Sequence, residues 1–587
     1  MIKINERDIA NVENKFNLTF DEERRTAILN LKTTDIVACA GSGKTTMMCA
    51  KIDILTNKQP FPNNKGIAVL SLTNVAIEQI KNKLGNEHNI FKYPNYCETI
   101  QKFVTKYVLN SWYNLMHNKK IEAIDNDFFV LRFKEKVEYK KIKYLEKINF
   151  IFEDIYTDGV DIFYNEQKIE DKQFARLRND TNREYIKEIK NAKLQLIDEG
   201  ILNYRDAFEI ATRYLKENKR LKEYIKQRFQ FCFVDEMQDC RKWEKNFLDE
   251  CFSDICLQRI GDPNQQIYEN TYWFPSNYIK IDKSIRNSVN IAEFARKFED
   301  LPNEMIGNIQ NNIKVKTFLY NTSNISNVKD KFIEEIKKEK LNERKDAIFK
   351  IIGKVYKENS NGKIELSNFC GCTNEIGNYN MFFNKTLQQN NNRIMATFID
   401  VMYYLYIKID KKNKENIKNK KEFCNKINAF INREDLYKKL KNITKEKLID
   451  FSKKYFKKIL INIFSNKDYF SNTYDEIINK KEKNTVTLTP YIKDGVKVDF
   501  NTIAGVKGET HTATLVCETF YRYYDIEYIL NKYIKHNTKT KTSKDFLHST
   551  YVAFTRPTDM LCIAIREEVY NKFKEEIDKF NVEVIKI

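Results

Sequence analysis

Residues 36–46, IVACAGSGKTT, decide the fold of this chain. The run begins as an apolar strand, turns through small residues and leads into a helix near Thr46, which is the context of a phosphate-binding P-loop, although Ala38 replaces the first glycine of the strict pattern. Small residues let backbone N–H groups close on phosphate oxygens, Lys44 brings a cation to the β- and γ-phosphates, and Thr45 can ligate Mg²⁺. The residues predicted to bind the nucleotide are Ala40, Gly41, Ser42, Gly43, Lys44, Thr45 and Thr46.

The pattern around this loop predicts an α/β fold. Residues 18–84 alternate helix, strand, glycine loop, helix, strand and helix, and short apolar runs return between 229 and 268. Further strand-like runs at 279–281, 346–356 and 486–566 predict a second α/β unit. Between these runs the chain is helical and charged, and residues 142–156, IKYLEKINFIFEDIY, read as an amphipathic helix.

These patterns predict two parallel sheets, each interrupted by a mainly helical insertion. The first unit comprises 1–106 and 199–275, with 107–198 as its insertion. The second comprises 276–376 and 484–587, with the Lys-rich residues 377–483 as its insertion. No internal repeat is visible.

Two adjacent acids follow a buried strand about 190 residues after the P-loop. The run FCFVDEMQD places Asp235 and Glu236 where a parallel strand ends. Two carboxylates there are costly unless they hold a metal or take part in chemistry. Asp235 is therefore a candidate Mg²⁺ ligand, and Glu236 a candidate general base for an attacking water.

Composition points to a polyanionic partner in a reducing compartment. Lys and Arg total 101 against 82 Asp and Glu, a net charge of +19, which suits nucleic acid, although an AT-rich coding sequence explains a Lys-rich composition equally well. No run of about 18 apolar residues occurs, and acids near the N-terminus argue against a signal peptide, so a cytoplasmic protein is expected. The 12 cysteines are scattered; Cys370 and Cys372 lack a second pair at metal-ligand spacing and read as loop cysteines.

The motifs resemble, in order, those of the UvrD/Rep group of superfamily 1 DNA helicases. The matching segments are 36–45, 68–84 (AVLSLTNVAIEQIKNKL), 99–103 (TIQKF), 235–239 (DEMQD), 261–268 (GDPNQQIY), 284–288 (SIRNS), 502–509 (TIAGVKGE) and 551–556 (YVAFTR). The resemblance implies two RecA-like P-loop domains that bind ATP and Mg²⁺ between them and step along single-stranded or forked DNA, in the 3′ to 5′ direction.

The resemblance also assigns roles to residues. It implies that Gln265 senses the γ-phosphate, that Arg286 and Arg556 are arginine fingers, and that Glu509 and Arg24 contact the nucleotide. Residues implied to contact DNA are Thr73, Asn74, Thr99, Gln101, Tyr268, Tyr272, Trp273 and Thr502.

The chain departs from the family pattern at three places. Arg24 stands where a glutamine reads the adenine edge, and because arginine has donors alone, preference for ATP over GTP is open. Asn270 and Thr271 replace a base-stacking pair, with Tyr272 and Trp273 as substitutes or as core aromatics. The run KGETH leaves open whether Glu509 or His511 approaches the ribose.

Two further functions compete with unwinding. The KGETH run and the length of the chain also resemble helicase subunits encoded beside OLD-family nucleases in Gabija-type antiviral defence, which predicts an ATPase that senses DNA and regulates a partner nuclease. A nuclease in the chain itself is disfavoured, because five histidines offer no metal cluster and about 30 residues follow Arg556.

Overall fold

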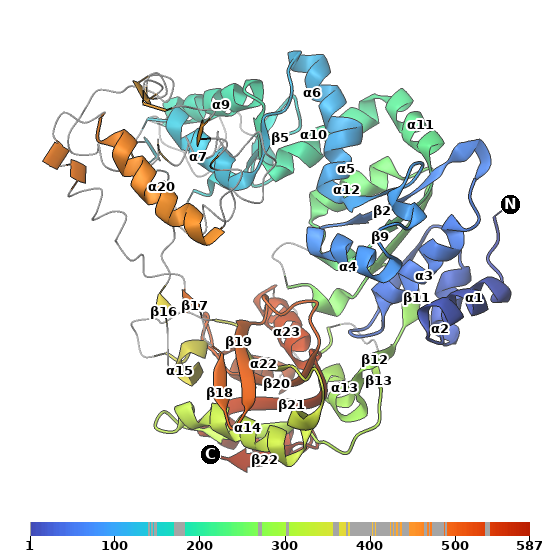
Figure 1. Ribbon diagram of the computed structural model, residues 1–587, viewed down its shortest axis with the longest axis vertical. Helices are drawn as coiled ribbons and strands as arrows, with labels where there is room; N and C mark the ends of the chain where they lie inside the picture. The colour runs from blue at the N-terminus through green and yellow to red at the C-terminus, as the bar shows by residue number, and fades with distance from the viewer. Residues whose placement is uncertain are drawn as a thin grey trace.

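A computed structural model describes residues 2–138, 150–168, 182–267, 273–300, 304–355, 363–370, 490–534 and 541–587, with shorter stretches between 141 and 145 and between 374 and 487. Two parallel sheets dominate it (Figure 1). The first has six parallel strands, in the order β11 (Tyr278–Ile281), β1 (Thr34–Ala38), β10 (Cys256–Gly261), β9 (Phe229–Val234), β2 (Gly66–Ser71) and β3 (Tyr96–Thr99).

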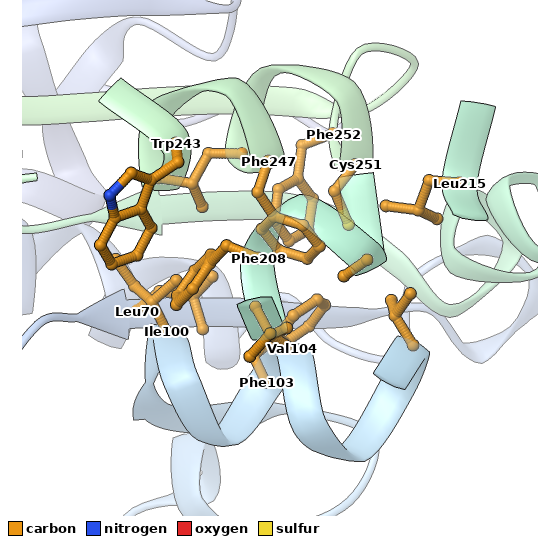
Figure 2. Packing of buried hydrophobic residues seen from close by; sticks show 14 of the residues in the cluster. Leu70, Ile100, Phe103, Val104, Phe208, Leu215, Trp243, Phe247, Cys251 and Phe252 are labelled. Atoms are coloured by element: carbon orange, nitrogen blue, oxygen red, sulfur yellow. The ribbon is translucent and has the colours of Figure 1, made fainter. Parts of the chain in front are cut away.

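Helices cover both faces of the first sheet, as its near-continuous apolar strands require. One face packs on α1 (Glu6–Phe16), α2 (Glu22–Leu29), α3 (Lys44–Thr56) and α4 (Asn74–Leu84). The other packs on α5 (Ile100–Val104), α10 (Tyr204–Glu217) and α12 (Lys242–Cys251), with α11 (Lys219–Arg228) leading into β9. Figure 2 shows this second core, in which Phe103, Phe208 and Phe247 pack among Leu70, Trp243 and Phe252.

The second sheet has seven strands, in the order β18 (Tyr491–Lys493), β19 (Val496–Thr502), β15 (Phe349–Gly353), β20 (His511–Cys517), β21 (Pro557–Arg566), β14 (Lys316–Tyr320) and β22 (Glu583–Lys586). All its pairs are parallel except β18 with β19. One face packs on α14 (Val328–Lys338) and α15 (Leu366–Cys370). The other packs on α13 (Val289–Arg296), α22 (Asp525–Ile534), α23 (Lys541–Phe554), α24 (Glu567–Lys572) and α25 (Lys574–Asp578). Between the two sheets, β12 (Lys283–Ser288) pairs with β13 (Ile306–Ile309).

One strand lies in a different sheet from the one expected. Residues 279–281 were predicted to open the second unit, but β11 pairs with β1 of the first sheet, with Ile279 beside Ile36. The pairing buries Ile281 and completes the free side of β1, because the amide of Cys39 donates to the carbonyl of Ile281 at 3.0 Å. The first sheet therefore extends to residue 281.

The first insertion contains strands as well as the expected helices α6 (Asn110–His117), α7 (Asn126–Lys136) and α9 (Asn182–Asp198). Strands β5 (Ile155–Thr157), β6 (Ile162–Tyr164) and β7 (Gln167–Lys168) form an antiparallel sheet, and β4 (Ala123–Ile124) pairs with β8 (Ile201–Leu202). The predicted helix over 142–156 is thus wrong at its end, because β-branched and aromatic residues at 155–157 favour a strand over further helix.

The second insertion is bracketed by a short antiparallel pair, β16 (Asn374–Glu375) with β17 (Val486–Thr487). Within 377–483 the structure describes α20 (Lys445–Leu460), which agrees with the expected helical character, and scattered residues besides. In the described part of the chain, no helix combines the length and the apolar character needed to cross a bilayer. Cys370 is buried at the end of α15, and Cys372 lies outside the described residues.

Candidate functional site

The candidate site lies at the carboxyl ends of three neighbouring strands of the first sheet. Because β1, β10 and β9 are adjacent and parallel, the loops that follow them meet at one edge. The P-loop follows β1, Asp262 follows β10 and Asp235 follows β9. Segments far apart in the sequence are thereby brought to one place.

The P-loop has the shape of an anion cradle. Gly41 and Gly43 adopt positive φ angles of +70° and +76°, which side chains rarely tolerate. A Cβ on Gly41 would lie 2.5 Å from the Cβ of Arg286, so there is no room for one. The hydroxyl of Ser42 is buried without a hydrogen-bond partner, and α3 begins at Lys44 with its free N–H groups toward the loop. These features fit the phosphates of a nucleotide.

The acidic pair lies beside the P-loop. The hydroxyl of Thr45 donates to the Oδ2 of Asp235 at 3.1 Å. Burial, together with the neighbouring Glu236 carboxylate, raises the pKa of Asp235 to about 7. Burial also acts to raise the pKa of Glu236, but Lys44 and then Lys507 outweigh it, and the pKa falls below its ordinary value. A hydroxyl and a carboxylate crowded by a second acid are a donor set that suits a divalent cation.

A chain of amides holds the general-base candidate. Glu236 has a positive φ of 54°, and its carboxylate accepts a hydrogen bond from the Nε2 of Gln238. The Oε1 of Gln238 accepts from the backbone amide of Asp262 at 3.0 Å, and the Oδ2 of Asp262 accepts from the Nε2 of Gln265 at 2.8 Å. The predicted base and the predicted sensor are therefore joined through two side chains.

Both predicted arginine fingers reach this edge from the second sheet's side. Arg556 is 1% exposed, and its Nη2 lies 3.4 Å from the Oε1 of Gln265. Burial, and then the neighbouring Arg286, lower the pKa of Arg556 to about 9, while Glu236 opposes the shift. Burial likewise lowers the pKa of Arg286, whose Cβ faces Gly41 of the P-loop. Two buried arginines, one of which lowers the pKa of the other, favour an anionic ligand at this edge of the sheet.

Two residues for which the sequence predicted no role, Lys507 and His548, join the domains at the loop that carries Gln265. The Nζ of Lys507 lies 2.5 Å from the Oδ1 of Asp239 and donates to the carbonyl of Gln265 at 2.8 Å. The Nδ1 of His548 lies 3.0 Å from the carbonyl of Gln266 and therefore carries the proton. Lys507 lies within the segment 502–509 that resembles the family, but its partners belong to the first domain and could be identified only from the tertiary structure.

A pocket of about 260 Å³ adjoins the P-loop. It is lined by residues of the N-terminal segment, the P-loop and β12–β13, namely Leu18, Thr19, Phe20, Asp21, Arg24, Gly43, Thr46, Lys283, Ile285 and Asn308. A cavity of this size that opens beside the phosphate cradle fits a nucleobase.

Arg24 lies at this pocket but is bound to the protein. Its Nε and Nη2 donate to the carbonyl of Ser42 at 2.9 and 2.6 Å, and Nη2 also donates to the carbonyl of Lys283 at 2.6 Å. Its Nη1 forms an ion pair with Asp21. Arg24 thus ties the P-loop to β12, and the predicted contact of its guanidinium with the base is not supported by this geometry.

The side chain of Glu509 is also engaged by the protein. Its carboxylate forms an ion pair with Lys350 and accepts from the Nε2 of His511 at 3.0 Å, while the Nδ1 of His511 lies 2.9 Å from the hydroxyl of Thr514. His511 is 1% exposed, and burial lowers its pKa to about 4, so it is neutral near pH 7. Neither expected ribose contact is therefore offered freely to a ligand.

The predicted DNA contacts fall into two groups. Ser71 and Thr99, the last residues of β2 and β3, are paired in the sheet. Thr73 caps α4, which follows β2, and Thr99 caps α5, which follows β3. The predicted DNA contacts Thr73, Asn74, Thr99 and Gln101 therefore lie at one corner of the first sheet. Thr502 ends β19 of the second sheet.

One of the predicted stacking residues, Trp273, is buried. Trp273 is 5% exposed and packs in the core of the first sheet, where Gln266 binds its backbone, so the prediction that it stacks on a base is wrong. Small neighbours such as Gly261 make room for its ring. Tyr268 and Tyr272 lie outside the described residues.

Comparison with known proteins agrees with this geometry. Residues 20–286 match the UvrD/REP helicase N-terminal domain. The fold is accordingly α/β with two RecA-like domains built on parallel sheets.

Curated relatives carry helicase names. The chain is 26% identical over 274 residues to "ATP-dependent DNA helicase Rep" of Buchnera aphidicola subsp. Acyrthosiphon pisum, covering 43% of this chain and 38% of that protein. It is 24% identical over 328 residues to "Probable DNA helicase II homolog" of Mycoplasma capricolum, covering 51% and 42% respectively. The matches thus span about two fifths of the length of these relatives.

Among the described residues, no cluster of three or more His, Cys, Asp or Glu side chains forms a complete metal site. The hydroxyl of Thr45 and the carboxylate of Asp235 would supply part of the coordination shell of a divalent cation, and phosphate oxygens and water would supply the rest.

Proposed function

We propose that this chain is an ATP-driven motor that moves along single-stranded DNA and separates duplexes. The observation that carries the proposal is the convergence of Lys44, the acidic pair and two arginines from the other sheet's side on one cradle. The relatives named Rep and DNA helicase II support the DNA substrate. The direction, 3′ to 5′, is taken from the family that the motifs resemble.

The residues divide the work of hydrolysis. Lys44 and the P-loop amides bind the β- and γ-phosphates. Glu236 takes a proton from the attacking water as the bond from the γ-phosphorus to the bridging oxygen of ADP breaks. Arg286 and Arg556 neutralise charge that develops on the γ-phosphoryl oxygens. A divalent cation, Mg²⁺ in this proposal, would be held by Thr45 and Asp235 and would polarise the phosphate oxygens.

Stepping follows from where these groups are attached. Arg556 and Lys507 belong to the second domain, and both contact the loop of Gln265 in the first. Loss of the γ-phosphate leaves the two arginines facing each other without an anion, which favours opening of the cleft. We propose domain limits of 1–106 with 199–281 and 282–376 with 484–587, the boundary being moved to include β11.

The test is DNA-stimulated ATP hydrolysis by the purified chain. Oligo(dT) is expected to raise the rate, and Lys44→Ala to lower the stimulated rate at least about 100-fold, since it removes a charge-assisted contact in a buried site. Lys81→Ala, on the exposed face of α4, is the matched control. Activity that survives Lys44→Ala would refute the P-loop assignment.

The burial of Trp273 favours a second candidate, an ATPase that senses DNA and regulates a partner nuclease of the OLD family in antiviral defence. Without a base stacked on Trp273, a motor holds the strand that it pulls less firmly at this position. A forked duplex with a 3′ or a 5′ tail separates the two functions. Robust strand displacement by the isolated chain excludes an obligatory partner, whereas DNA-stimulated hydrolysis without displacement favours the sensor.

A further inference from the structure

A short loop on the second domain exposes two aromatic rings. Between β20 and α22, Tyr521 and Tyr523 are 48% and 52% exposed, and Arg522 between them is exposed as well. Burial of an aromatic ring is strongly favourable, so two exposed rings two positions apart in one loop indicate a surface that binds a ligand or partner.

The loop is ordered by its own contacts. Phe520 and Tyr524 form a β-bridge, their rings pack edge to face at 5.2 Å, and the amide of Tyr521 donates to the carbonyl of Tyr523 at 3.0 Å. The guanidinium of Arg566 lies 3.7 Å from the ring centre of Tyr524. The loop base is thus fixed, and a ligand that stacks on the tip loses little conformational entropy from the protein.

The surroundings of the rings are cationic. The guanidinium of Arg522 lies 5.6 Å from the ring centre of Tyr521, and the Nζ of Lys363 lies 3.5 Å from that of Phe520. In the described part of the chain neither cation forms an ion pair, whereas the nearby acid Glu518 is buried against Arg566. A ligand that combines flat rings with negative charge is therefore complementary to this surface.

The loop also lies next to a predicted DNA contact. Thr502 pairs with Gly353, and Ile352 pairs with Val516, so the ends of β19, β15 and β20 form one row. Two strand spacings, about 10 Å, separate the line of Thr502 from that of Cys517, from which the loop departs. Figure 1 shows β19, β20 and α22 together in the second domain. The row of strand ends thus leads from Thr502 to Cys517, after which the loop begins.

We propose that Tyr521, Arg522 and Tyr523 form a base-stacking contact for single-stranded DNA on the second domain. The proposal rests on the proposed function. It gives the second domain a base-stacking contact, which the buried Trp273 does not provide on the first domain. The ring of Tyr521 stacks on one base, and the ring of Tyr523, which packs on Tyr528 at 4.8 Å, offers its other face to the next. Arg522 lies toward the phosphates, so the contact tolerates any sequence.

The experiment measures affinity of the full-length chain for fluorescent oligo(dT) by anisotropy. Tyr521→Ala with Tyr523→Ala is expected to weaken binding about 5- to 150-fold per stacked base lost, and Tyr521→Trp with Tyr523→Trp to restore it, because tryptophan keeps a flat π-face. The matched control is Tyr93→Ala with Tyr224→Ala, two exposed tyrosines near the opposite ends of the first sheet's strands, which should leave affinity unchanged.

An abasic oligonucleotide separates stacking from charge. It should bind the wild-type chain more weakly than oligo(dT) does, while the double alanine variant should bind both about equally. Equal affinity of wild type and double alanine variant for oligo(dT) would overturn the stacking proposal, as would an alanine effect of the same size on the abasic strand. If the wild-type chain binds no single-stranded DNA, the proposed function itself fails.

Discussion

Arg24 makes the sharpest prediction about the nucleotide. Four of its five N–H groups point at protein acceptors: three hydrogen bonds reach the carbonyls of Ser42 and Lys283, and one ion pair reaches Asp21. A side chain engaged in this way cannot read the edge of a base. Sites that hydrogen-bond a distinguishing group reject its analogue by about 10⁴- to 10⁵-fold, whereas shape alone gives about 10- to 200-fold.

The two purines share one ring frame, so the pocket of about 260 Å³ distinguishes them poorly by shape. We therefore expect kcat/KM for ATP to exceed that for GTP by less than about tenfold, or about 1.4 kcal/mol. Arg24→Gln supplies an amide with both donor and acceptor and should raise the preference for ATP. The same substitution removes the hydrogen bonds to the carbonyls of Ser42 and Lys283, so kcat/KM should fall by about tenfold for both nucleotides. Arg24→Met, which loses these hydrogen bonds and supplies no amide, should show the same fall without a greater preference for ATP.

The assay is steady-state hydrolysis of each nucleotide at saturating oligo(dT). A wild-type preference for ATP above about tenfold would refute the reasoning. If such a preference disappeared in Asn308→Ala, the exposed amide of Asn308 in the pocket would be the base reader in place of Arg24.

Three further predictions concern buried groups. Lys507→Met leaves the carboxylate of Asp239 without its ion-pair partner, so kcat/KM for ATP should fall about 10- to 100-fold. In a double-mutant cycle, adding Asp239→Asn should recover part of this loss. In the folded protein the pKa of His511 is about 4, below its unfolded value of about 6.5, so its contribution to stability is complete above pH 6.5 and is lost as the pH falls toward 4. Between pH 7.5 and 5, the free energy of unfolding of the wild type, measured by thermal unfolding, should therefore fall by about 2 kcal/mol more than that of His511→Gln. An equal fall in both proteins would contradict this prediction. Lys193→Met leaves the fully buried carboxylate of Asp206 without its ion-pair partner, so the free energy of unfolding measured in urea should fall by about 3–5 kcal/mol. The fall should be much smaller when Asp206→Asn is added.

The strand order explains why separate local motifs come together at one candidate site. Each motif follows its own apolar strand, and in a parallel α/β sheet such ends necessarily meet at one edge. The P-loop and Asp235 were therefore predicted from residue types and their order, and Gln265 from the resemblance to the helicase family. The structure places all three at one edge of the first sheet. The strand at 279–281 was misplaced because an apolar run is equally compatible with either sheet, and the choice depends on which sheet edge is free.

Arg24 and Trp273 show the opposite case. Both became candidates through the positions that they hold in the family pattern, and a position in a motif does not say which partner a side chain meets. Whether an arginine meets a base or a backbone carbonyl depends on segments more than 200 residues away, such as Lys283. Whether a tryptophan is exposed depends on a core assembled from distant helices and strands.

The sequence by itself determined the phosphate cradle, the acidic pair and the two-sheet α/β plan, because these depend on local order and on the rules of parallel sheets. Tertiary structure alone decided which donors and rings remain available to ligands, such as the ring of Tyr521, and which are engaged by the protein, such as Arg24 and Trp273. The reason is physical: hydrogen bonding and burial are satisfied between residues that are distant along the chain, and a side chain engaged by one partner is not free for another.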